Sequence, residues 1–113
     1  MTGKDLFNIL ISQKVQFPES EGELVEEFNQ ALRENRVYYI WKNDNMIGFL
    51  THEIRTKLGH KKLLINKLVI LKEFRDRLNL VPLRNYIREL YRDMDCDGFY
   101  FRSKRRSRIS YLT

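Results

Sequence analysis

The chain has 113 residues, of which 42% are hydrophobic, and a formal net charge of +6. This hydrophobic content predicts one compact domain over residues 1–113, and it excludes a membrane span because no apolar run approaches the roughly 20 residues needed. The basic balance favours an acidic partner, namely nucleic acid, an anionic cofactor or an acidic protein surface, and it serves solubility equally well.

The cysteine content and the N-terminal residues indicate where the protein works. A single cysteine, Cys96, leaves no internal disulfide and predicts a reducing setting. We expect this thiol to be a small buried residue rather than a nucleophile. The apolar stretch 6–11 is too short for a secretory signal, so we expect a soluble, intracellular protein.

Two helices are predicted at the start of the chain. The first covers 4–14, after a capping box formed by Thr2 and Asp5. The second follows the capping-box pair Ser20 and Glu23 and stops near residue 35. The apolar face of the first helix is expected to contain Leu6, Phe7, Leu10 and Ile11.

An antiparallel meander follows the helices. β-Branched and aromatic residues predict strands over 37–42, 46–55 and 62–71. The connecting turns are predicted at 43–45 and 58–60, where Asn, Asp and Gly tolerate left-handed backbone angles. Because the third strand is apolar on both faces, we expect it in the middle of the sheet.

A third helix and a short strand complete the predicted order. Pro82 is expected in the first turn of this helix, where its missing N–H costs nothing, and the helix runs to about Met94. Its predicted core residues are Leu83, Ile87, Leu90, Tyr91 and Met94. Residues 99–101 form an aromatic strand, and the basic C-terminal segment 102–113 ends in the strand-like stretch 109–112.

Three segments in this order resemble the GNAT acetyltransferase superfamily. They read Met46-Ile47-Gly48-Phe49-Leu50, Asn66-Lys67-Leu68-Val69-Ile70 and Lys72-Glu73-Phe74-Arg75. The resemblance covers about 5–101 and rests on the order and spacing of the segments. It implies an α+β, GNAT-like three-layer fold with two N-terminal helices, an antiparallel meander, a central helix after the third strand and short C-terminal strands, the last splayed from its neighbour.

The same resemblance implies that the chemistry of the family is reduced. Aligning the arginine of the family's phosphate-binding loop with Arg75 puts Leu78 and Leu80 on positions that are normally glycine or alanine, where a side chain fills the space of a phosphate oxygen. Asn66 matches the general-base glutamate and cannot accept a proton at neutral pH. Tyr111 is the one late candidate for the general acid. No catalytic residue is therefore predicted, and no cofactor is expected.

If the chain is nevertheless an active enzyme, the resemblance implies that it binds acetyl-CoA at the end of the third strand and at the following helix. The matching positions are Val69, Leu71, Arg75, Arg77 and Leu80. No metal site is predicted, because His52 and His60 have no Cys or Asp at ligand spacing. Trp41 and the pair Tyr38-Tyr39 are expected to be core and sheet-face residues.

Two basic clusters are candidates for contacts with a polyanion or a protein partner. The first is a helix stripe of Arg84, Arg88 and Arg92, spaced four residues apart, which is equally typical of a solvated helix face. The second is the C-terminal run, beside which Tyr100 and Phe101 offer rings for stacking on bases. A charged edge strand explains this run equally well. Its basic residues are Arg102, Lys104, Arg105, Arg106 and Arg108.

Three functions remain open at this point. The first is a catalytically degenerate acetyltransferase-like module that works by binding, and the resemblance to acetyltransferase-like proteins of tailed bacteriophages implies a virion or assembly component in the host cytoplasm or the virion. The second is a divergent, acetyl-CoA-dependent N-acetyltransferase. The third is a small basic nucleic-acid-binding regulator on an unrelated α+β fold.

Overall fold

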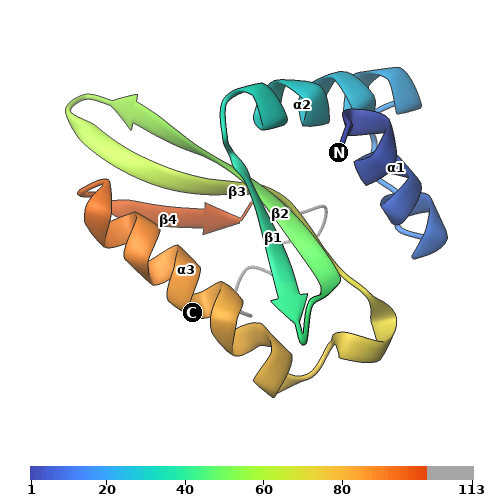
Figure 1. Ribbon diagram of the computed structural model, residues 1–113. Coiled ribbons are helices and arrows are strands. Elements are labelled where there is room, and N and C mark those ends of the chain that lie inside the picture. Colours follow the sequence, from blue (N-terminus) through green and yellow to red (C-terminus); the bar gives the residue numbers. More distant parts are fainter. Residues whose placement is uncertain (102–113) are drawn as a thin grey trace.

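In the computed structural model, residues 1–101 form a sheet with helices on both of its faces (Figure 1). The structure describes these residues, apart from the side chains of residues 77–80 and 101. The elements are α1 (Gly3–Ser12), α2 (Glu21–Arg33), β1 (Val37–Lys42), β2 (Asn45–Lys57), β3 (His60–Ile70), the short 3-10 helix η1 (Lys72–Phe74), α3 (Arg77–Asp93) and β4 (Gly98–Phe101). The predicted order of helices and strands is confirmed over this part of the chain.

Both N-terminal helices begin at the predicted capping boxes. The hydroxyl of Thr2 accepts a hydrogen bond from the backbone N–H of Asp5, and Ser20 does the same for Glu23. These local bonds satisfy N–H groups that the first turn of a helix leaves without partners. The helices end one to two residues earlier than predicted, next to Lys14 and Asn35, which adopt left-handed backbone angles.

The sheet has the strand order β1-β2-β3-β4, in which the first three strands are antiparallel. The turn at Asn43 and Asp44 has two left-handed residues, as predicted. Strand β4 pairs parallel to β3, and the pairing runs from Lys62–Gly98 to Ile65–Phe101. The central position predicted for β3 is confirmed.

A bulge in β3 changes which face its side chains occupy. Thr51 lies opposite Lys67 and His52 lies opposite Ile65, so Asn66 between them has no partner on β2. Side chains normally alternate strictly along a strand, and one extra residue shifts that alternation. Leu63 and Ile65 before the bulge pack in the α3 core, whereas Lys67 and Val69 after it lie on the opposite face.

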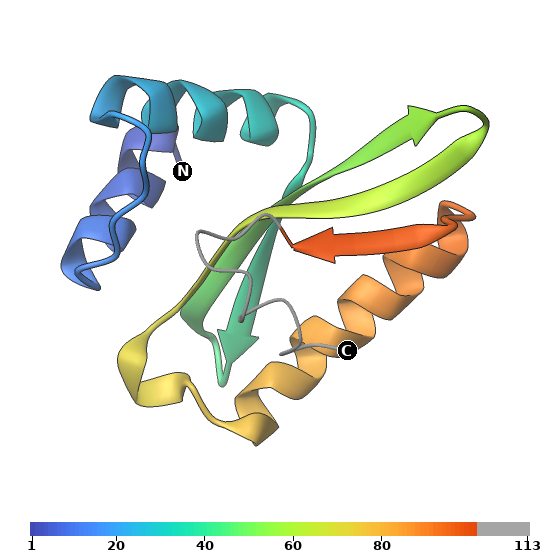
Figure 2. The same cartoon turned by 180° about the vertical axis from the view of Figure 1, so that it is seen from behind.

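The sheet thus carries two separate cores. On one face, Phe28 of α2 meets Phe49 edge-on, with ring centroids 5.7 Å apart, and α1 packs behind α2 (Figure 2). On the other face, Leu83 and Ile87 of α3 pack against Ile40 and its neighbours in the sheet. Burying a large apolar side chain contributes about 1.5–3 kcal/mol, so each face holds its helices firmly.

Several predictions about the helices and their faces are wrong. Helix α3 begins at Arg77, so Pro82 lies inside the helix and not in its first turn. Proline has no N–H, and the helix there lacks one backbone hydrogen bond. Ile11 and Met94, predicted to face the core, are 56% and 40% exposed, because each lies at or just past the end of its helix. Trp41 is 56% exposed and so is not a core residue, but it lies on β1 with its ring centroid 6.5 Å from that of Tyr39, as a sheet-face residue does.

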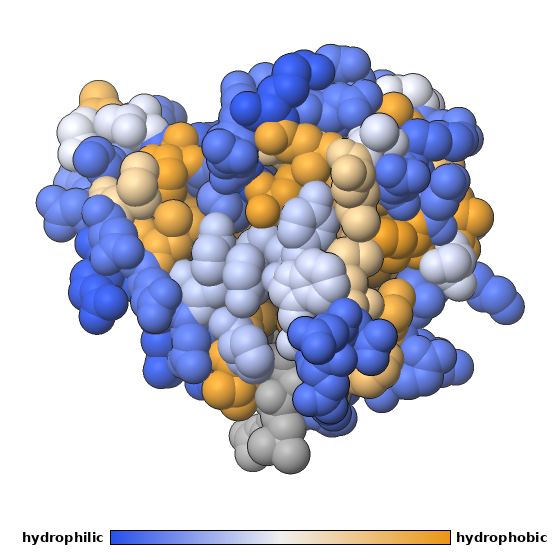
Figure 3. Space-filling model, viewed as in Figure 1, coloured by the Kyte–Doolittle hydropathy of each residue, from blue (hydrophilic) through white to orange (hydrophobic). Residues whose placement is uncertain are grey.

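The surface agrees with the basic, polar composition. Figure 3 shows residues of intermediate hydropathy at the centre of the face seen in Figure 1, hydrophobic areas beside them and mostly hydrophilic residues around the rim. Within residues 1–101, no helix has both the length and the apolar character that a membrane span requires.

Gly48 is needed where β2 passes closest to β3. A Cβ atom at this position would lie 2.3 Å from the backbone oxygen of Val69. No side-chain rotation relieves a contact with backbone, so the two strands would have to move apart. The glycine in the segment 46–50 is thus explained by packing between strands.

We expect Gly48→Ala to lower the free energy of unfolding by about 1–3 kcal/mol, the usual cost of overpacking. Gly22→Ala is the matched control, because a Cβ atom in that exposed first turn of α2 meets nothing within 4 Å. The control should leave stability unchanged or raise it by up to about 1 kcal/mol. Urea denaturation of both variants measures the difference, and equal stabilities would contradict the close-approach explanation.

Candidate functional site

The bulge in β3 places a buried amide where, within residues 1–101, β3 pairs with β2 alone. Asn66 is 5% exposed, and its Oδ1 atom has no hydrogen-bond partner among the described residues. Pairing with β4 ends at Ile65 and Phe101, so the β3 edge beyond the bulge has no partner strand in the part of the chain that is described. A buried acceptor without a donor costs about 1–3 kcal/mol. Among the described residues, the site therefore contains an unused acceptor next to a part of β3 that has one partner strand.

The residue after the bulge is a buried lysine held by two glutamates. Lys67 is 3% exposed, and its Nζ atom lies 3.2 Å from Glu19 and 3.2 Å from Glu27. The ammonium also lies 5.0 Å from the centroid of the Phe17 ring. Carboxylates and an aromatic face are the groups that stabilise a desolvated ammonium. Residues from β3, from the α1–α2 connection and from α2 thus form one ammonium-binding cluster, which we call the Lys67 cluster.

On the opposite face, a histidine and two tyrosines connect the sheet to α3. His52 Nε2 lies 2.9 Å from the hydroxyl of Tyr86, and the Tyr86 ring stacks on Tyr38 with 3.8 Å between centroids. The Nδ1 atom of His52 is buried without a partner among the described residues. Burial, and then the charge of Arg36, lower the pKa of His52, and burial, followed by Tyr38, raises the pKa of Tyr86. Both side chains are therefore neutral at pH 7.

The positions predicted for an acetyl-CoA contact lie close together but are largely committed to other bonds. The backbone N–H of Leu71 donates to the Ile47 carbonyl at 2.8 Å, and Arg75 Nε donates to the Ile70 carbonyl at 2.8 Å. Val69 is buried in the α1–α2 core. Arg77 and Leu80 lie in the first turn of α3, and their side chains, like that of Leu78, are outside the described ones. These residues therefore offer a phosphate group fewer donors than the resemblance implies.

The predicted arginine stripe lies along one helix, as expected. Arg84 is half-buried and Arg88 is exposed, and the Nε atom of Arg92 lies 3.8 Å from the carboxylate of Asp93. The basic residues of the C-terminal run, and Tyr111 with them, lie outside the described residues. They are Arg102, Lys104, Arg105, Arg106 and Arg108.

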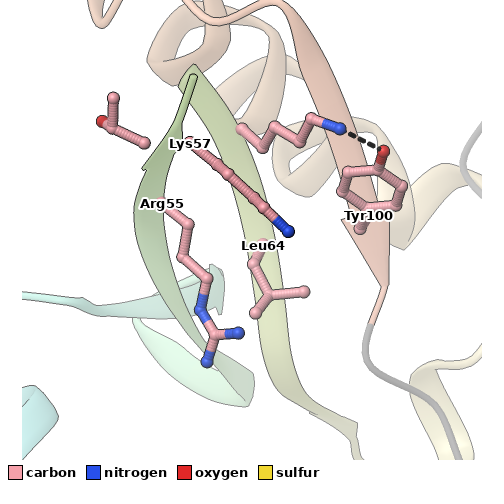
Figure 4. Close-up of a pocket in the computed structure, with 6 residues that line it drawn as sticks. Arg55, Lys57, Leu64 and Tyr100 are labelled. Atoms are coloured by element: carbon pink, nitrogen blue, oxygen red, sulfur yellow. Dashed lines mark hydrogen bonds between the residues drawn. The ribbon is translucent and has the colours of Figure 1, made fainter. Parts of the chain in front are cut away.

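A second cationic surface was not predicted from the sequence. Arg55, Lys57, Lys62 and Tyr100 line a hollow of about 480 Å³ across β2, β3 and β4 (Figure 4). The sequence signal was incomplete, because Arg55 and Lys62 lie at the ends of two predicted strands while Lys57 lies beyond the predicted end of the first at residue 55. What was missing is the register, which brings Arg55 directly opposite Lys62.

The Lys67 cluster was also missed. A lone lysine within an apolar central strand is a signal for a buried charge that requires partners. Its partners cannot be identified from the sequence alone, because Glu19 and Glu27 are 48 and 40 residues away along the chain.

No protein-family model matches the sequence, and no curated protein matches it. Solved structures do match. A probable acetyltransferase superposes with a TM-score of 0.68 at 13% identity, over 96% of this chain and 79% of the other. A possible acetyltransferase from Clostridium difficile 630 gives 0.67 at 16% identity, over 94% and 78%. An aminoglycoside N-acetyltransferase in complex with CoA gives 0.63 at 12% identity, over 92% and 74%.

At these identities the likeness establishes the fold. The chain has the α+β GNAT acetyltransferase fold that the sequence predicted. The alternative of an unrelated α+β fold is wrong. Cofactor use, activity and partners do not follow from the fold.

The Lys67 cluster yields a stability prediction. Glu19→Gln with Glu27→Gln should lower the free energy of unfolding by about 3–5 kcal/mol, because Lys67 would remain charged, buried and uncompensated. Adding Lys67→Met to that pair should recover most of the loss, since methionine fills a similar volume without a charge. Chemical denaturation of the wild type, the double variant and the triple variant measures these differences in the free energy of unfolding. A triple variant as unstable as the double would show that packing, and not charge, holds this cluster.

The buried His52 yields a pH prediction. Its pKa lies below the ordinary value of about 6.5, so the unfolded chain binds this proton more readily than the folded protein. Its contribution to stability is therefore present above pH of about 6.5 and is lost as the pH falls below it. His52→Gln should reduce the loss of unfolding free energy between pH of about 7.5 and 5.5, within the window that the lowered pKa defines. Equal pH profiles for wild type and His52→Gln would contradict the prediction.

Proposed function

We propose that this chain is an acetyltransferase-fold protein that works by binding and does not transfer acetyl groups. The observation that carries the proposal is the Lys67 cluster. Acetyl transfer to an amine requires a group that takes a proton from the acceptor and space for that acceptor beside the central strand. Here the ammonium of Lys67 lies at the centre of that strand, and Glu19 and Glu27 hold it.

The neighbouring side chains support the loss of a general base. Asn66 has an amide at the position that the family resemblance gives to the base, and an amide cannot accept a proton at neutral pH. His52 is 6% exposed and lies on the α3 face against Tyr86. Neither residue meets the requirement that a base reach the proton that it removes.

One observation favours the second candidate, a divergent acetyl-CoA-dependent N-acetyltransferase. Among the described residues, the Oδ1 atom of Asn66 is a buried acceptor without a donor, next to a part of β3 that has β2 as its one partner strand. A ligand with an N–H group at this position would satisfy the acceptor. CoA carries amide N–H groups and is bound by the aminoglycoside N-acetyltransferase of the same fold. Against this candidate stand the existing bonds of Leu71 and Arg75.

A binding function needs an accessible surface of suitable charge. The net charge of +6 supports an anionic partner, and the stripe Arg84, Arg88 and Arg92 supplies cations on the outer side of α3. The C-terminal basic run adds five more in sequence. A virion or assembly role rests on family analogy and stays a prediction.

Calorimetric titration with acetyl-CoA and with free CoA tests the proposal. We expect no heat of binding and no thermal shift for either ligand. The aminoglycoside N-acetyltransferase of the same fold is the positive control for both ligands. Binding in the micromolar range would overturn the proposal in favour of the second candidate. In that case Asn66→Leu, which removes the unused acceptor, should weaken the binding about tenfold, the equivalent of roughly 1.4 kcal/mol.

A further inference from the structure

Three cations that the sequence analysis did not single out lie on one face of the sheet. Arg55 and Lys57 on β2, Lys62 and Leu64 on β3, and Tyr100 on β4 surround the hollow shown in Figure 4. We call this set the cationic face. Helices α1 and α2 pack at the other end of this side of the sheet, against Phe49, Val69 and Lys67 (Figure 2). No helix within residues 1–101 covers the cationic face.

The pairing of β2 with β3 places like charges opposite each other on this face. Arg55 and Lys62 are directly opposed in the register, an arrangement that destabilises a sheet. Glu53, 3.1 Å from Arg55, is the one carboxylate that pairs with the face in the described part of the chain. The side chain of Arg55 remains 62% exposed, and Lys57 has no carboxylate within ion-pair distance in residues 1–101. A bound anion would relieve this repulsion.

Tyr100 adds an aromatic surface to the same face. Its side chain is 46% exposed, although tyrosine on a sheet normally buries most of its ring. Lys62 Nζ donates to the Tyr100 hydroxyl at 2.9 Å and lies 5.0 Å from the ring centroid. These contacts hold the ring in place beside the cations. A fixed ring beside several cations is the arrangement on which successive bases stack while phosphates are neutralised.

We propose that the cationic face binds single-stranded nucleic acid, with Arg55, Lys57 and Lys62 contacting phosphates and Tyr100 stacking on a base. An acidic peptide would use the cations but would gain little from the exposed ring. The chain's own segment 102–113 is a poor occupant, because five of its first seven residues are basic and carry the same charge as the face.

This inference rests on the proposed function only in taking binding as the role of the protein. Retained CoA binding would overturn the proposed function and leave the cationic face untouched. If the cationic face does not bind nucleic acid, the proposed loss of acetyl transfer still stands, and the protein binds a different partner. The two failures are thus distinguishable by separate titrations.

Fluorescence anisotropy with a labelled single-stranded DNA and the matching RNA tests the proposal. The face variant carries Arg55→Gln, Lys57→Gln and Lys62→Gln. A control variant removes three exposed charges elsewhere, at Lys4, Lys14 and Arg33. Only the face variant should lose affinity steeply. The magnitude of its slope of log K against log salt should fall by about 2, because three phosphate contacts are lost at about 0.7 each. Comparing the affinities of the two labelled oligonucleotides shows whether the face prefers DNA or RNA.

Tyr100→Leu separates stacking from charge, and we expect a loss of affinity of about tenfold with an unchanged salt slope. A face variant that binds as wild type overturns the proposal. The proposal is also overturned if polyglutamate displaces the oligonucleotide and Tyr100→Leu has no effect on affinity. This result would indicate an acidic protein partner. Amide NMR shifts of the wild-type protein on titration keep the test independent of variant folding. Shifts in β2, β3 and β4 support the proposal, and shifts confined to α3 or to residues 102–113 contradict it.

Discussion

The single-residue bulge at Asn66 is the constraint on which the rest of the structure depends. A strand without it would place residues 63, 65, 67 and 69 on one face, and Lys67 would then enter the apolar α3 core. The bulge shifts the alternation, so that Leu63 and Ile65 pack under α3 while Lys67 and Val69 face the N-terminal helices. One strand therefore supplies two cores and one ion cluster. The same shift leaves the Asn66 amide buried and without a donor.

The fold and the chemistry of the chain point in different directions. The arrangement of helices and strands is that of the matched acetyltransferase structures. Within the described residues, β4 pairs parallel to β3 from Lys62 to Ile65. The groups at the centre of that arrangement are the Asn66 amide, which is buried, Lys67, which is paired with two glutamates, and His52, which contacts Tyr86. A protein of this kind can keep its fold while residues on its surface carry a binding function. The charges on the outside of β2, β3 and β4 are consistent with that division.

The sequence predicted the local features well and the distant ones poorly. Capping at Thr2 and Ser20, the turn at Asn43 and the strand order depend on neighbouring residues, and all were predicted. The start of α3 was not, because Pro82 is typical of a first turn and the preceding residues form helix regardless. The Lys67 cluster and the opposition of Arg55 to Lys62 depend on strand register and on residues far apart in the chain. Such pairings have no local signature.

The Lys67 cluster also limits how this protein can change through evolution. Loss of its carboxylates leaves a buried ammonium unpaired, and loss of the lysine leaves two carboxylates facing each other. Each single substitution is therefore harmful on its own, although a coordinated change of all three positions is not. An apolar replacement of this cluster therefore requires coordinated substitution of Glu19, Glu27 and Lys67, because each intermediate leaves a buried charge without its partner.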